Sequence, residues 1–135
     1  MPHSHQLKIL DTLIVSAGTG VEGYRSAASE TSNAALRLQF TDCAEAAEDV
    51  LLELETRVRQ LGGEPAWASA PGPSARRPGR RYSVSMGELA RRQAEIAQRF
   101  ERALASTGLD ADTRAALSLG VAVFRGGRED EGPRA

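Results

Sequence analysis

The sequence has few of the residues that crosslinked or metal-stabilised folds require. It contains one cysteine and two histidines in 135 residues, and both histidines, His3 and His5, lie close to its beginning. A single cysteine can form neither an intramolecular disulfide nor a cysteine-rich zinc site. Cys43 lies among the apolar positions of a predicted helix, where we expect an inert, buried side chain. The fold must therefore depend on the packing of its core.

Aromatic residues and long apolar runs are also scarce. Aromatic residues make up 4% of the chain and hydrophobic residues 41%, so the core must be built from Ala, Leu and Val. No stretch approaches the roughly 18 consecutive apolar residues of a membrane-spanning helix. The first residues also lack the basic and then apolar pattern of a signal peptide. We therefore expect a cytoplasmic protein with no membrane span.

The chain has no excess of charge of either sign. Seventeen basic and eighteen acidic side chains give a net charge of -1 at pH 7. A near-neutral molecule does not attract nucleic acid or anionic membranes as a whole. Binding of either would require a local basic cluster, and nucleic acid is not the partner that we expect.

The longest helical pattern spans residues 33 to 62. Apolar residues recur there at intervals of four and three, which is typical of a helix with one apolar seam. Asn33 can cap its beginning, and Gly62 and Gly63 followed by Pro65 end it. The acidic side chains of this helix lie away from the seam. The seam residues are Leu36, Phe40, Cys43, Ala47, Val50, Leu54, Val58 and Leu61.

Three more helices are predicted, at residues 7–30, 85–107 and 111–125. The first has its seam at Leu10, Ile14, Ala17, Val21, Tyr24 and Ala28, and the third at Leu89, Gln93, Ile96, Phe100 and Ala103 or Leu104. The fourth helix is short. We expect disordered tails at 1–6 and 126–135, and a long linker rich in Pro and Arg at 63–84.

These patterns predict an all-α protein with a single domain over residues 7–125, folded as an antiparallel four-helix bundle. Leu38 and Leu52 lie opposite the seam of the second helix, exposed to water if the chain is monomeric. A homodimer, or another protein partner, through this helix is therefore a hypothesis.

The first half of the chain resembles a bacterial ferritin-like family of four-helix bundles, domain of unknown function 2383. The resemblance covers about residues 7–65 and depends on the order and spacing of several short pieces. It implies a ferritin-like fold but no activity, because the family has no assigned biochemical function. The matching pieces are Leu13-Ile14, Gly20, Glu22 to Arg25, Ala27-Ala28, Phe40, Leu54 and Val58 to Pro65.

Ferritin-like bundles often hold two metal ions with inward Glu residues and two Glu-x-x-His motifs. No histidine follows position 5, so that motif is absent. Glu22, Glu48 and Gln93 are the weak candidate ligands, and the two carboxylates point well away from their seams. Gln93 is the inward polar residue of the third helix, where we expect a hydrogen-bonded amide. We therefore predict no metal, no cofactor and no catalytic residue.

The sharpest charge feature is the arginine loop, Arg76, Arg77, Arg80 and Arg81, followed by Tyr82. Guanidinium groups beside an aromatic ring can contact phosphate and stack on a base, but a solvated linker has the same composition. The sequence favours a non-catalytic structural or protein-interaction role, which the ferritin-like resemblance loosely links to stress. The alternatives are a di-iron or di-manganese oxidoreductase and a weak binder of nucleic acid or another anionic partner through this loop.

Overall fold

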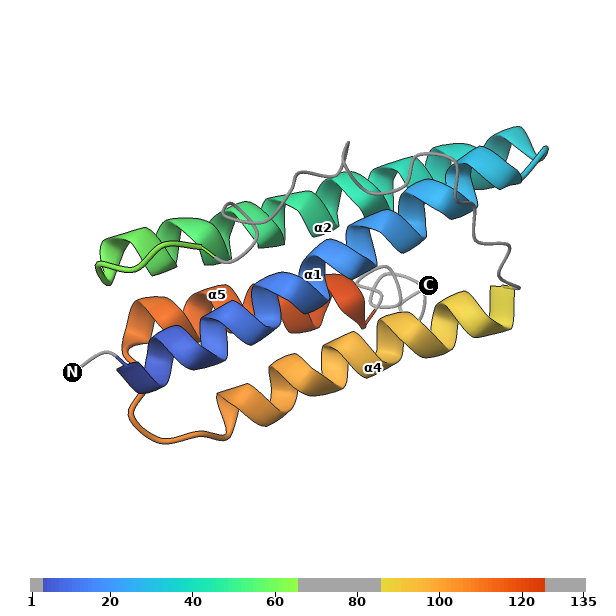
Figure 1. Ribbon diagram of the computed structural model, residues 1–135. Helices are drawn as coiled ribbons and strands as arrows, with labels where there is room; N and C mark the ends of the chain where they lie inside the picture. The colour runs from blue at the N-terminus through green and yellow to red at the C-terminus, as the bar shows by residue number, and fades with distance from the viewer. Residues whose placement is uncertain (1–3, 66–85, 126–135) are drawn as a thin grey trace.

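The computed structural model describes residues 4–65 and 86–125, and these residues form four helices and no strand (Figure 1). The prediction of an all-α protein is confirmed. The helix bounds agree with the predicted ones to within a few residues, and the fourth helix is the shortest. The helices are α1 (Ser4–Glu30), α2 (Ala34–Gln60), α4 (Met86–Leu104) and α5 (Ala111–Phe124).

Helices α1 and α2 lie side by side, and the chain reverses between them (Figure 1). The Asn33 side chain caps α2 as predicted, accepting a hydrogen bond of 3.0 Å from the backbone N–H of Leu36. At the other end of α2, Gly62 has a φ of 88°. Glycine adopts this left-handed conformation without the strain that a Cβ would cause. Short local signals therefore set both ends of α2.

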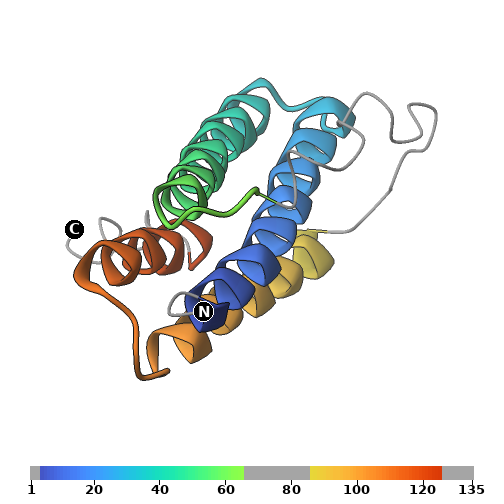
Figure 2. The same ribbon diagram turned by 60° about the vertical axis from the view of Figure 1, so that its left-hand side comes forward.

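The four helices form a closed ring of contacts (Figure 2). Each of α1 and α5 packs against both α2 and α4, whereas α2 and α4 do not pack against each other in the described ranges. Apolar side chains from all four helices meet inside this ring, and the Phe100 and Phe124 ring centroids lie 5.8 Å apart. The seams predicted for α1, α2 and α4 supply most of this core. Its fully buried members include Leu10, Ile14, Ala17, Ala47, Val50, Leu54, Phe100 and Leu117.

The predicted disordered tail at 1–6 is wrong for residues 4–6, because α1 begins at Ser4. The Gln6 side chain is buried, and its Oε1 accepts a hydrogen bond of 3.0 Å from the backbone N–H of Asp110. This contact joins the first turn of α1 to the residue before α5. No local pattern predicts a bond between residues so far apart in the sequence. The predicted tail at 126–135 and most of the predicted linker, 66–84, lie outside the described residues.

Arg57 joins α2 to the beginning of α5. The sequence pattern places it off the seam, yet its side chain is only 12% exposed. Its guanidinium donates to Oδ2 of Asp110 at 2.6 Å, to Oγ1 of Thr113 at 3.1 Å and to Oε1 of Gln60 at 2.6 Å. A guanidinium with several partners of this kind holds two helices in a defined position.

Asp110 is the N-cap of α5 and should make the stability depend on pH. The backbone N–H of Thr113 donates to its Oδ1 at 3.0 Å; this bond and the bonds to the side chains of Thr113 and Arg57 lower the pKa of Asp110 to about 2. Because the folded pKa lies below the unfolded value, the charged form stabilises the fold above pH 4. We expect this contribution to disappear between about pH 4 and pH 2.

The measurement is the free energy of unfolding by urea as a function of pH. Asp110→Asn keeps a good capping side chain but cannot ionise, so its curve should be flatter than that of the wild type below pH 4. Glu95→Gln, at an exposed carboxylate of α4, is the control and should follow the wild type. Parallel curves for Asp110→Asn and the wild type would contradict the assignment.

Candidate anion-binding groove

A groove with a volume of about 470 Å³ runs along the outside of the bundle where α1 and α4 meet. Its α1 side comes from positions three and four residues apart, which share one face of a helix. Its α4 side comes from positions 99, 102 and 103, which share a face for the same reason. The lining residues are His5, Lys8, Ile9, Thr12, Leu13, Arg99, Arg102 and Ala103.

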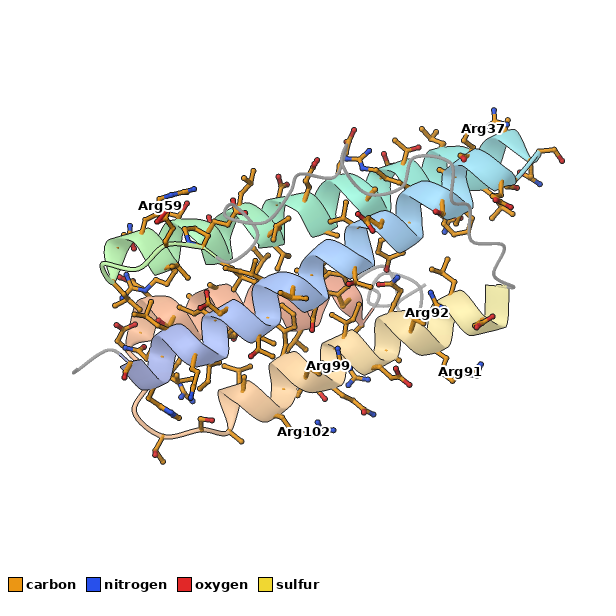
Figure 3. The ribbon with its side chains drawn as sticks, in the orientation of Figure 1. Arg37, Arg59, Arg91, Arg92, Arg99 and Arg102 are labelled. Carbon is orange, nitrogen blue, oxygen red and sulfur yellow. The ribbon has the colours of Figure 1, made fainter. Side chains whose placement is uncertain are left out.

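The charged groups in the groove are all cationic. Lys8 and Arg102 are exposed, and no carboxylate of the described residues lies within ion-pair distance of Lys8, Arg99 or Arg102. Arg99 is held in place because its Nη1 donates a hydrogen bond of 3.0 Å to Oγ of the buried Ser16. Figure 3 shows Arg99 on the side of α4 that faces α1, with Arg102 about one turn further along the same helix. Among the described residues, the cations of the groove are therefore not neutralised by an ion pair.

Three other arginines of the described chain, Arg25, Arg57 and Arg125, already have carboxylate partners. Arg25 bonds to Glu48 at 2.9 Å, and Arg125 bonds to Glu101 at 2.6 Å. Arg57 is fully used in holding α5, and the hollow of about 340 Å³ beside it also contains Glu53 and Asp112. That second hollow mixes charges of both signs. The α1–α4 groove is thus better suited to an anion.

The floor of the groove is apolar. Leu13 is 2% exposed and Ala103 9% exposed, and both belong to the core, while Ile9 is partly buried against it. A cationic rim around an apolar floor suits a partner that has both a carboxylate or phosphate and an apolar group. An ordinary charged surface has no apolar floor of this kind.

The predicted metal candidates do not meet in a metal site. Glu48 lies on the surface of α2 and pairs with Arg25, and Glu22 is partly buried on α1. Gln93 is buried, as predicted, but belongs to α4, which does not pack against α2. Among the described residues, no group of three or more His, Cys, Asp or Glu side chains is placed to hold a metal ion.

Gln93 occupies the interface between α4 and α1. Its Nε2 lies 3.0 Å from the position that a Cβ of Gly23 would occupy, and its Oε1 lies 3.2 Å from the same position at Gly20. These glycines therefore make room for the amide. We predicted a hydrogen-bonded side chain, yet Oε1 of Gln93 has no hydrogen-bond partner.

The groove was not predicted from the sequence. The anionic-partner site that the sequence predicts, at Arg76, Arg77, Arg80, Arg81 and Tyr82, lies outside the described residues. Lys8 and Arg102 are far apart in the chain, and nothing in the spacing within either segment indicates that they meet. The helical period does show that Arg99 and Arg102 share a face, which is the only available signal.

Comparison with models of protein families, with curated proteins and with solved structures found no match to this chain. None of the helices in the described ranges is long and apolar enough to cross a membrane. The function must therefore be argued from the groove itself.

Proposed function

We propose that this protein is a non-catalytic interaction protein, an antiparallel four-helix bundle of the ferritin-like kind, whose α1–α4 groove binds a carboxylate-bearing partner. One observation supports the proposal above all others. Lys8, Arg99 and Arg102 surround an apolar floor, and no carboxylate of the described chain is paired with any of them.

The chemistry of the lining favours binding over catalysis. Lysine and arginine are fully charged at neutral pH and offer only hydrogen-bond donors, which suits them to hold carboxylate or phosphate oxygens. A planar guanidinium also contacts a carboxylate through two parallel bonds. The groove therefore offers charge and orientation to an anion.

The net charge favours a protein partner over nucleic acid. Binding to a nucleic acid depends on neutralising many phosphates in a row, whereas the groove has three permanent cations on a molecule of net charge -1. Three cations beside an apolar floor instead match a short acidic segment with apolar side chains.

The test is binding of a fluorescein-labelled peptide that contains three glutamates and one leucine, measured by fluorescence anisotropy. Lys8→Gln combined with Arg102→Gln should weaken binding about tenfold, since two charge-assisted contacts together contribute at least about 1.4 kcal/mol. Wild-type affinity should fall as salt rises.

The matched control is Arg37→Gln combined with Arg59→Gln, which removes the same charge from exposed positions on α2, distant from the groove (Figure 3). This control should bind the peptide as the wild type does. Equal loss in both double variants would show that only the net charge matters. Failure of the wild type to bind at low salt would overturn the proposed function.

A further inference from the structure

The outward face of α2 has a second regular stripe, opposite its core seam. Its positions are four, three, four and three residues apart, so they form one line along the helix. The two leucines at its ends are 64% and 55% exposed. All three carboxylates between them are exposed, and none forms an ion pair within the described chain. The acidic stripe is Leu38, Asp42, Glu45, Asp49 and Leu52.

The acidic stripe and the α1–α4 groove lie on opposite sides of the described bundle. α2 and α4 occupy opposite corners of the ring of helices, separated by α1 and α5 (Figure 2). The stripe faces away from the core seam of α2, and Arg99 and Arg102 line the groove from α4, with Arg99 on the side that faces α1 (Figure 3). The acidic stripe and the cations of the groove therefore lie on different sides of the described bundle.

This arrangement argues against a symmetric dimer through α2. In a two-fold dimer the same surface faces itself, so Asp42, Glu45 and Asp49 would meet their own copies. Like charges placed opposite one another at an interface oppose association. When the acidic stripe of one copy contacts the α1–α4 groove of another, carboxylates face cations and not other carboxylates.

We propose that the carboxylate-bearing partner is a second copy of this chain, whose acidic stripe docks in the α1–α4 groove. The inference rests on the proposed function of the groove. Three carboxylates of the stripe match the three cations Lys8, Arg99 and Arg102 in number. An exposed leucine of the stripe covers the apolar floor formed by Ile9, Leu13 and Ala103.

The dimensions of the two surfaces are compatible. The stripe extends over fifteen residues, whose ends lie about 21 Å apart at a rise of 1.5 Å per residue, so one of its leucines reaches the groove while the carboxylates contact the rim. Because the two surfaces differ, each associated pair keeps one free stripe on one copy and one free groove on the other. Association of this kind continues from copy to copy and weakens as salt screens the charges.

The experiment uses two charge-reversed variants of the full chain and sedimentation equilibrium. Lys8→Glu combined with Arg102→Glu reverses two charges of the groove and leaves the stripe unchanged. Glu45→Lys combined with Asp49→Lys reverses two charges of the stripe and leaves the groove unchanged. The four side chains are exposed and make no ion pair with the described chain, so both variants should fold, which circular dichroism verifies.

We expect the wild type to exceed its monomer mass of 14.4 kDa at high micromolar concentration in about 50 mM salt, and to return to it in about 500 mM salt. Each variant alone should remain monomeric. An equal mixture should form a complex of two chains and no larger one, because only one intact stripe and one intact groove can meet.

A monomeric wild type, or a mixture that stays monomeric, would overturn the self-association. Self-association of each variant on its own would also overturn the proposal. The glutamate peptide separates this failure from failure of the proposed function. If the stripe variant, with its intact groove, binds the peptide while no copies associate, only the identity of the partner is wrong.

Discussion

Replacing Val50 by aspartate is expected to unfold this protein. Val50 is fully buried on α2, within the core that all four helices share. Burying a carboxylate without a partner costs several kcal/mol, and a domain of this size is stable by only about 5–15 kcal/mol. The helical signal in far-ultraviolet circular dichroism should fall sharply at 25 °C, or the melting temperature should drop steeply.

Leu52→Asp is the matched control for this prediction. It places the same group two residues along the same helix, but at a side chain that is 55% exposed. A surface substitution of this kind usually changes stability by no more than about 0.5 kcal/mol. Equal melting temperatures for the two variants would show that α2 does not bury the face that we describe.

Replacing Gly120 by alanine is expected to disturb the packing between the two shortest helices. A Cβ at this position would overlap the ring of Phe100, which is fully buried between α4 and α5. The ring is fully buried and packs against Phe124, so either Phe100 or α5 must shift to make room. Overpacking of this kind typically costs about 1–3 kcal/mol, even though alanine favours the helix more than glycine does.

Gly87→Ala is the control because it makes the same chemical change in α4, where no atom of the described residues lies within 4 Å of the new Cβ. It should stabilise the protein by at most about 1 kcal/mol. The two variants should therefore shift the midpoint of urea unfolding in opposite directions. A stabilising Gly120→Ala would mean that α5 does not pack on Phe100 as described.

The effect at Val50 can be predicted from the sequence, whereas the effect at Gly120 cannot. Burial of Val50 follows from the spacing of apolar residues in α2, which places it on the seam with Leu54 and Val58. The close approach at Gly120 does not follow from any spacing. Glycine in a helix indicates a packing constraint, but its partner, Phe100, belongs to another helix.

Local chemistry was enough to predict the elements of the fold. The period of apolar residues predicts the four helices and the inward position of Gln93, and Asn33 and Gly62 are recognisable ends of α2. Each of these properties depends on residues within a few turns of one another. Helix formation and capping are decided at that range.

Tertiary structure alone decided which charges meet. The bonds of Arg57 to Asp110 and of Gln6 to Asp110 join segments far apart in the chain. The groove also depends on the way in which α1 lies against α4, since Lys8 and Arg102 share no local pattern. Amphipathic helices specify which face is buried but not which neighbour covers it. The sites of this protein therefore arise from the pairing of helices that the sequence already predicts one by one.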